Sequence, residues 1–190
     1  MANWLIAGLG NPGPQYEHTR HNVGFWWLDQ LAHDLSTTFA VENKFHGQLA
    51  QCPLLEHKLF LLKPLVFMNR SGQSVAALAN FYKIPLTNIL IIHDELDLAT
   101  GTARLKRGGG HGGHNGLRDI IARTGSKDFL RCRLGIDHPG DSRQVADYVL
   151  SKPSQPDRQR IVSAIDDSLR VLPDILSGNL DKAMNWLHSQ

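Results

Sequence analysis

The sequence predicts an α/β fold in which helices cover both faces of a twisted, mixed and mainly parallel sheet. Short, continuous apolar runs bounded by glycine, proline or asparagine have the length and setting of strands. Longer segments with apolar residues at helical spacing alternate with these runs along the chain. The run NILIIH at 88–93 shows no polar alternation, which is typical of a strand covered on both sides. Such an alternation of strands and helices favours a sheet with crossover helices on its faces.

The first strand is expected at Asn3–Gly8, an apolar run that ends at glycine and proline. The following strands are short runs of the same kind, with Pro53 separating the second from the third. They are expected at Gly47–Cys52, Lys58–Leu62, Asn88–His93, Thr102–Lys106 and Leu130–Ile136.

The first long helix is expected at Val23–Leu35, where apolar residues recur at helical spacing. A second is expected at Asn69–Tyr82, with the apolar side chains on one face, and a third lies between the last two strands. After Pro139 the chain is expected to be mostly helical. These further helices are placed at Asn115–Arg123, 142–150, 155–176 with a break near Pro173, and 179–188.

Length and composition favour one globular domain spanning residues 1–190. The chain is 42% hydrophobic and 20% charged, and it contains no repeat, low-complexity tract or long linker. Its two cysteines, Cys52 and Cys132, form no CxxC pattern, which fits a reducing compartment. The apolar run at the N-terminus is too short for a signal peptide or a membrane span. We therefore expect a cytoplasmic protein that makes no membrane contact, and a monomer, because no exposed apolar stripe demands a partner.

The segment Gly8–Gly13 matches the pattern GxGxxG directly after a strand, so a nucleotide-binding module is one alternative. That motif works by opening a helix whose amides hold a pyrophosphate. Pro12 and Pro14 flank the last glycine and disfavour a helix at this point. We expect instead a sharp loop that presents the side chain of Asn11.

Ten histidines is a high count, and four lie in glycine-rich or strand-end positions: His21, His93, His111 and His114. A zinc site needs three or four converging ligands. His111 and His114 have i, i+3 spacing, but they stand in GGGHGGHNG, which is too glycine-rich for a preformed helix, and there is no HExxH motif. A metal-dependent peptidase therefore stays an alternative, and the prediction is a hydrolase without metal or other cofactor.

His21 lies in a polar loop that leads into the first helix, where a neutral imidazole can accept a proton from water. A general base needs an orienting partner, and Asp94 at the end of the NILIIH strand is suitable for it. His93 or Glu95 can equally be the functional neighbour. Asn11 and Asp94 both follow apolar strands, as a site at the carboxyl edge of a parallel sheet requires.

No residue stands out as a nucleophile. Ser71 lies at a helix start, where serine usually caps the helix, and no GxSxG motif occurs. Cys52 and Cys132 lie in strand patterns typical of small buried residues. The sequence therefore favours attack by a water molecule that a histidine activates.

The positive charge is concentrated in one stretch of the chain. Residues 104–133 carry eight Lys and Arg against two Asp, a net charge of +6, whereas the rest of the chain has a net charge of −4. Such a concentration indicates a face that binds a polyanion, with solvated surface cations as the alternative.

Several segments, in order and with compatible spacing over most of the chain, closely resemble the bacterial peptidyl-tRNA hydrolase family. They are GLGNPG at 8–13 with Tyr16, TRHNVG at 19–24, Lys63-Pro64 with FMN at 67–69 and Ser71-Gly72, HDELD at 93–97, Lys106 with GGGHGGHNGL at 108–117, RCRLG at 131–135 and VADYVL at 145–150.

The resemblance implies hydrolysis of the ester that joins a peptide to the 3′-terminal ribose of tRNA, which recycles peptidyl-tRNA released from ribosomes. It identifies His21 as the general base, Asp94 as the group that keeps it basic, and Asn11 as a catalytic-site contact to the peptide.

The resemblance also implies substrate contacts around these residues. Asn69 and Asn115 are expected to bind the substrate backbone or to position the water. Tyr16, Phe67 and His114 are expected to line the same crevice. Lys106 and Arg133 are expected to hold the phosphate of the acceptor end, so the implied partner is the acceptor stem and CCA end of tRNA, with no obligate protein partner.

Overall fold

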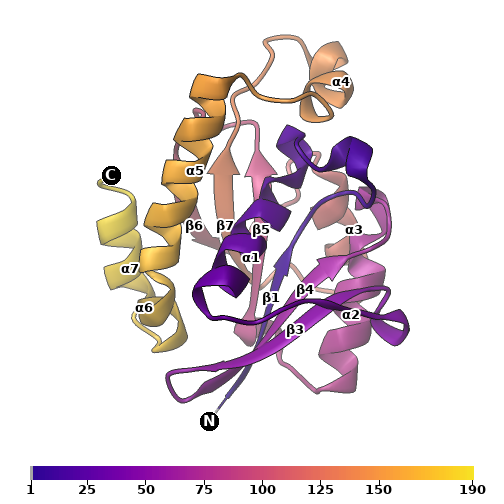
Figure 1. Cartoon of the computed structure of the whole chain (residues 1–190), viewed down its shortest axis with the longest axis vertical. Helices are drawn as coiled ribbons and strands as arrows, with labels where there is room; N and C mark the ends of the chain where they lie inside the picture. The colour runs from indigo at the N-terminus through magenta and orange to yellow at the C-terminus, as the bar shows by residue number, and fades with distance from the viewer. Residues whose placement is uncertain (1) are drawn as a thin grey trace.

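The computed structural model describes residues 2–190, and its strands form one seven-stranded sheet in the order β2-β3-β4-β1-β5-β7-β6 (Figure 1). The strands of this part are β1 (Asn3–Gly8), β2 (Ala40–Glu42), β3 (Gly47–Leu54), β4 (His57–Pro64), β5 (Ile89–Glu95), β6 (Ala103–Arg107) and β7 (Leu130–Gly135). The helices are α1 (Val23–Asp34), α2 (Ser71–Phe81), α3 (Asn115–Thr124), α4 (Val145–Val149), α5 (Gln155–Arg170), α6 (Leu172–Leu176) and α7 (Leu180–Leu187).

The expected mixed sheet is confirmed, and its parallel pairing lies at the centre. β4, β1, β5 and β7 pair in parallel, whereas β2 with β3, β3 with β4 and β6 with β7 pair antiparallel. Among the strands of residues 2–190, only β3 and β6 therefore run against the common direction. The carboxyl ends of the four central strands meet at one edge of the sheet, the upper edge in Figure 1.

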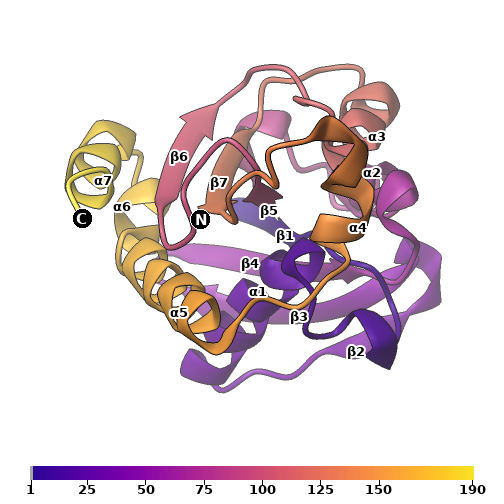
Figure 2. The same cartoon turned by 90° about the horizontal axis from the view of Figure 1, so that it is seen from above.

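Helices cover both faces of the sheet, as expected (Figures 1 and 2). One apolar core lies between the sheet and α1, α5, α6 and α7, and the other lies between the sheet and α2 and α3. β5 contributes Leu90 and Ile92 to the first core and Ile89 and Ile91 to the second, which confirms that NILIIH is a strand buried on both faces. No helix described over residues 2–190 is long and apolar enough to cross a membrane.

All the predicted strands and helices occur close to their predicted bounds, and three details differ. The short strand β2 was not predicted. Pro53 lies inside β3 rather than between strands, because β2 pairs only with Gly47–Leu49 and the outer edge beside Pro53 needs no amide donor. Ser71 does not cap α2, because its hydroxyl donates to the carbonyl of Met68.

Gly8, the first residue of GLGNPG, and Gly24 allow β1 and α1 to approach closely. A Cβ atom on Gly8 would lie 2.2 Å from the carbonyl oxygen of Gly24 in α1, and one on Gly24 would lie 2.5 Å from the amide nitrogen of Leu9. The loop itself opens only a short 3₁₀ turn, Pro14–Tyr16, and α1 begins at Val23. Close packing of β1 on α1 thus accounts for Gly8 and Gly24 without a pyrophosphate.

We predict that Gly24→Ala destabilises the fold by about 1–3 kcal/mol, because the new methyl group would meet backbone atoms of Leu9 and Ile92 that cannot move independently. Urea unfolding measures the change. Gly110→Ala is the matched control, since no atom lies within 4 Å of its added Cβ, and it should change the free energy of unfolding by less than about 0.5 kcal/mol. Equal stability of the two variants would contradict the packing argument.

Candidate active site

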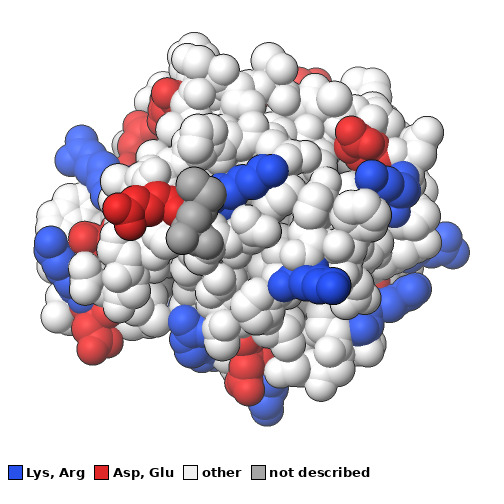
Figure 3. All heavy atoms as spheres, turned by 90° about the horizontal axis from the view of Figure 1, so that it is seen from below, with Lys and Arg blue, Asp and Glu red and all other residues white. Residues whose placement is uncertain are grey.

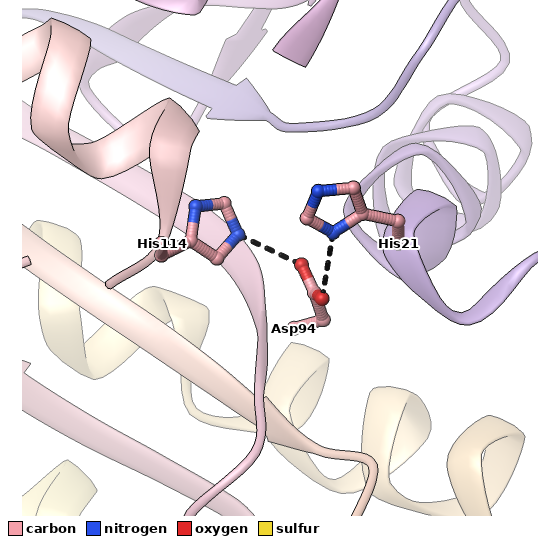
Figure 4. A group of neighbouring side chains, drawn as sticks. All are labelled: His21, Asp94 and His114. Atoms are coloured by element: carbon pink, nitrogen blue, oxygen red, sulfur yellow. Dashed lines mark hydrogen bonds and ion pairs between the residues drawn. The ribbon is translucent and has the colours of Figure 1, made fainter. Parts of the chain in front are cut away.

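A buried carboxylate at the carboxyl end of β5 binds two imidazoles (Figure 4). Oδ2 of Asp94 lies 2.8 Å from Nδ1 of His21, and Oδ1 lies 2.8 Å from Nε2 of His114. The Asp94 side chain is 2% exposed. Burial by itself raises the pKa of this carboxyl group, but the two imidazoles lower it well below its usual range. Asp94 is therefore an ionised acceptor for both rings.

His21 occupies the middle of a short 3₁₀ segment, η2 (Arg20–Asn22), which leads into α1. Since Asp94 accepts at Nδ1, the hydrogen-bond pattern assigns the proton of a neutral His21 to that nitrogen. Nε2 has no hydrogen-bond partner among residues 2–190, and the side chain retains 12% exposure. Its lone pair is thus free to accept a proton from a water molecule, as a general base must.

His114 has both ring nitrogens engaged. It is the N-cap of α3, where Nδ1 accepts from the amides of Gly116 and Leu117 at 3.1 and 3.3 Å. Nε2 therefore carries the proton and donates it to Asp94. His114 lies beside His21, with ring centroids 5.2 Å apart, but it offers no free nitrogen to a ligand. Its ring orients the carboxylate.

His93 and Glu95 were the alternatives to Asp94, and neither contacts His21. His93 is 1% exposed and donates from Nδ1 to the carbonyl oxygen of Asp94. Burial, together with the neighbouring His114, lowers the pKa of His93 to about 3, so its ring is neutral. Glu95 ends β5 and is partly exposed.

His21, Asp94 and His114 are the one group of side chains in residues 2–190 with the composition and proximity of a three-residue metal site. Tetrahedral zinc with ligands at about 2.0–2.1 Å keeps neighbouring ligand atoms about 3.3 Å apart. The nitrogen-to-oxygen distances here are 2.8 Å, and both nitrogens that face Asp94 carry protons. The arrangement is a hydrogen-bonded carboxylate, and a metal would have to displace both protons.

Three asparagines predicted at the site stand on three segments that meet at Met68. The amide nitrogen of Met68 donates to Oδ1 of Asn11 at 2.7 Å, and Asn69 follows Met68 in the segment η4 (Met68–Arg70). A Cβ atom on Gly116 would lie 2.7 Å from Sδ of Met68, so the start of α3 with Asn115 packs there as well. This bond fixes the orientation of the Asn11 amide, and its Nδ2 donor has no hydrogen-bond partner among residues 2–190.

Tyr16 and Phe67 contact each other edge to face, with ring centroids 6.3 Å apart. Phe67 is 56% exposed although it is a large apolar side chain. The pair bridges the loop that carries Asn11 and the segment that carries Asn69. An exposed aromatic pair at this point offers an apolar surface to a ligand beside the histidine cluster.

The positive segment does not form one uniform face. On the antiparallel pair β6 and β7, Arg104 lies opposite Arg133 and Lys106 opposite Arg131, all on the face that points away from α5. Arg131 is 2% exposed and donates to the carbonyl oxygens of Gly109 and Gly110, so it anchors the glycine-rich loop. The amino-end face of the molecule shows basic and acidic side chains intermixed (Figure 3).

The sequence did not single out Arg104 as a binding candidate or Arg131 as a buried residue. Arg104 is the cross-strand neighbour of Arg133, whereas the predicted Lys106 lies against Gly109 of the glycine-rich loop. The alternation of cations at 104, 106 and at 131, 133 was a readable signal that they share a face. The burial of Arg131 had no such signal, because it depends on a loop folding over it.

Ser71 and the two cysteines, the nucleophiles considered in the sequence, are all unsuited to attack an ester. Ser71 is fully buried, and its hydroxyl donates to a carbonyl group. Cys132 is buried in β7, and burial raises its pKa to about 12, so no thiolate forms near neutral pH. Cys52 is also buried.

A cavity of about 650 Å³ adjoins this site, but His21, His93 and His114 do not line it. It lies between the loop after β1, the outer face of α1 and α5, and it shares Asn11 and Asn22 with the site. The chemistry of the histidine cluster, rather than the size of this cavity, therefore marks the candidate active site.

Comparisons with known proteins identify the family of the chain. The family model described as peptidyl-tRNA hydrolase matches residues 5–190. The chain belongs to the peptidyl-tRNA hydrolase family. Peptidyl-tRNA hydrolases of Coxiella burnetii and Neisseria meningitidis are 57% and 53% identical to it, over 97% and 98% of this chain and 97% of each relative. The crystal structure of peptidyl-tRNA hydrolase from Acinetobacter baumannii has a TM-score of 0.95 and 45% identity, covering 97% of this chain and 94% of that one. Hydrolysis of the ester bond of peptidyl-tRNA, the activity of this family, is thus the activity of this chain.

We predict that His21 titrates above the ordinary imidazole pKa of about 6.5. Burial lowers the pKa of His21. The ion pair and the hydrogen bond with Asp94 together raise this pKa by more than burial lowers it, so the net shift is upward. A general base works in its neutral form, so kcat/KM should rise with pH through this pKa. In Asp94→Asn both the imidazole midpoint and the acidic limb of the rate profile should move to lower pH.

NMR titration of the imidazole protons measures these midpoints. His93, with a pKa of about 3, serves as the internal control and should not titrate between roughly pH 5 and 9. A His21 midpoint that does not change in Asp94→Asn would contradict the coupling.

Proposed function

We propose that this protein cleaves the ester bond between a peptide and the 3′-terminal ribose of tRNA by general-base catalysis, without a metal or a covalent intermediate. One observation carries the proposal. Nδ1 of His21 donates a hydrogen bond to the buried carboxylate of Asp94, and the lone pair of Nε2 has no partner among residues 2–190. In that state the ring can take a proton only at the nitrogen that remains accessible.

In the reaction, Nε2 of His21 accepts a proton from water while the water oxygen forms a bond to the ester carbonyl carbon. The imidazolium that forms is stabilised by the negative charge of Asp94. Collapse of the tetrahedral intermediate breaks the bond to the ribose oxygen, which takes the proton back from Nε2. The products are a peptide acid and a tRNA with its terminal hydroxyl restored, and His21 is again neutral.

The asparagines suit the uncharged part of this substrate, since an amide recognises ester and peptide groups without adding charge. Asn11 can donate from Nδ2 to a peptide carbonyl, because Oδ1 is held by Met68. Asn69 and Asn115, both exposed, are the candidates for positioning the water or the developing oxyanion. Tyr16 and Phe67 supply the apolar wall beside them, and His114 acts through Asp94.

We propose that Arg133 and Lys106, together with Arg104, hold phosphates of the acceptor stem and CCA end. β7 is the strand next to β5, so these cations stand beside the strand that carries Asp94. Arg131 takes no part in binding, since its guanidinium is buried under the glycine-rich loop. We further propose that the enzyme acts as a cytoplasmic monomer.

We predict that His21→Ala lowers kcat by roughly 10²-fold to 10⁴-fold, because general-base catalysis typically contributes that much. Binding of tRNA should stay nearly unchanged, since the phosphates are held elsewhere. The control is His33→Ala, an exposed histidine of α1. Turnover near that of the wild type in a folded His21→Ala protein would overturn the proposal.

The substrate for this assay is an N-blocked aminoacyl-tRNA, compared with the unblocked form and measured with and without a chelator. We expect cleavage of the blocked substrate and no effect of the chelator. Activity that is lost with chelator and restored by zinc would support a metal-dependent hydrolase instead. Stabilisation of the fold by a mononucleotide without any ester cleavage would support a nucleotide-binding module.

The cation face predicts the salt dependence of tRNA binding. Each phosphate contact that is removed should reduce the slope of log K against log salt concentration by about 0.7 on a single strand or 0.9 on a duplex. Arg104→Gln and Arg133→Gln should each show this change in a filter-binding titration. Arg170→Gln, an exposed residue at the end of α5, is the control and should leave the slope unaltered. If both variants keep the wild-type slope, these residues are ordinary surface cations.

A further inference from the structure

We propose that Arg20 is a positioning residue for the general base, which it fastens to the segment 145–152. The inference rests on the proposed role of His21, and it concerns how that ring is held. Arg20 precedes His21 in η2, and the segment that contains α4 crosses the carboxyl edge of the sheet at the top of Figure 1.

One guanidinium nitrogen of Arg20 meets three oxygens of this segment. Nη1 lies 3.3 Å from the carbonyl oxygen of Lys152 and 3.5 Å from that of Tyr148, and it also donates to the hydroxyl of Ser151. The backbone adds a further bond, since the amide of Arg20 donates to the carbonyl of Ser151 at 3.1 Å. These contacts join parts of the chain that lie 128 to 132 residues apart.

The partner segment is itself anchored. The guanidinium carbon of Arg20 lies 4.1 Å from the ring centroid of Tyr148, a cation–π contact, and the hydroxyl of Tyr148 donates to the carbonyl of Ile136, just after β7. The hydroxyl of Ser151 donates onward to the carbonyl of Tyr148 at 2.6 Å. Arg20 is therefore tied to a group whose position is set by the sheet.

The three residues of η2 are each held by a different element. Arg20 binds the segment after α4, His21 binds Asp94 of β5, and Asn22 exchanges two hydrogen bonds of 2.9 Å with the backbone of Asn11. His21 is the middle residue, so its backbone is fixed from both sides. A displacement of about 1 Å at a reacting group can cost 10²-fold in rate, which gives these flanking bonds a kinetic consequence.

The guanidinium of Arg20 is engaged through Nη1 and through the side that faces Tyr148. Its hydrogen bonds go to carbonyl and hydroxyl oxygens, and one face covers an aromatic ring, so Arg20 has no ion pair with a carboxylate within residues 2–190. A surface arginine that binds tRNA would instead present its fork to the phosphate. The contacts favour a role in holding His21 over a role in binding.

The test is a double-mutant cycle of Arg20→Ala and His21→Ala, assayed on N-blocked aminoacyl-tRNA. Arg20→Ala should lower kcat by about 10-fold to 100-fold, with KM and the salt slope of tRNA binding unchanged. In the His21→Ala background the same change should have almost no further effect, because a residue that acts through His21 has nothing left to position. Arg20→Lys keeps the positive charge over Tyr148 but not the planar guanidinium group. Its kcat should therefore lie between those of Arg20→Ala and the wild type.

Two outcomes would overturn the proposal. A flatter salt slope in Arg20→Ala would make Arg20 a phosphate contact, and an undiminished loss of rate in the His21→Ala background would place its effect elsewhere. Arg143→Ala is the matched control, since it removes an arginine that is 89% exposed just before α4, and it should leave kcat unchanged.

Ser151→Ala keeps the proposal testable if Arg20→Ala does not fold. It removes one acceptor from the same contact without changing the charge, and it should lower kcat by roughly 2-fold to 10-fold, the effect of a single hydrogen bond. A wild-type kcat in folded Ser151→Ala, with an unchanged His21 midpoint by NMR, would overturn the positioning role. Failure of the general-base mechanism is recognised separately, by the activity of His21→Ala alone.

Discussion

The buried carboxylate of Asp94 is the constraint on which the rest of the site depends. An isolated ionised carboxylate inside a protein costs several kcal/mol, so it persists only where its oxygens are bound by donors. Here each oxygen accepts one hydrogen bond from an imidazole, that of His21 just before α1 and that of His114 at the start of α3. Two segments that lie 93 residues apart in the sequence are thus drawn to the end of β5 by one charge. The site is assembled by the same interaction that stabilises it.

Three neighbouring histidines behave differently because their nitrogens meet different partners. His21 has one nitrogen on Asp94 and one free, so it can act as a base. One nitrogen of His114 accepts hydrogen bonds from two backbone amides and the other donates to Asp94, so this ring can only orient the carboxylate. His93 donates to a carbonyl group, but burial and the neighbouring His114 lower its pKa and keep it neutral. The residue type is the same in all three positions, and the hydrogen-bond partners decide its function.

The fold could be predicted from the sequence to a large extent, because burial on both faces leaves a direct record in apolar runs such as NILIIH. The pairing of His21 with Asp94 was predictable only as one of three possibilities, since the end of a strand does not say which side chain turns toward a loop 73 residues away. The double engagement of His114 and the burial of Arg131 left no local signal. Both arise from backbone groups of the glycine-rich loop and of α3, whose positions follow from tertiary contacts.

The arrangement of charge separates binding from chemistry. The pKa of Asp94 is shifted by burial and by two histidines, and no lysine or arginine contributes to that shift. Its negative charge is therefore available to stabilise an imidazolium on His21. The cations stand instead on β6 and β7, where Arg104 faces Arg133 across the strand pair and the apolar Ala103 and Leu105 point into the core. A guanidinium in contact with Asp94 would hold a phosphate near the ester, but it would also compete with His21 for the carboxylate. In the proposed mechanism, placing the cations on neighbouring strands lets the affinity for a polyanion and the basicity of His21 be set by different residues.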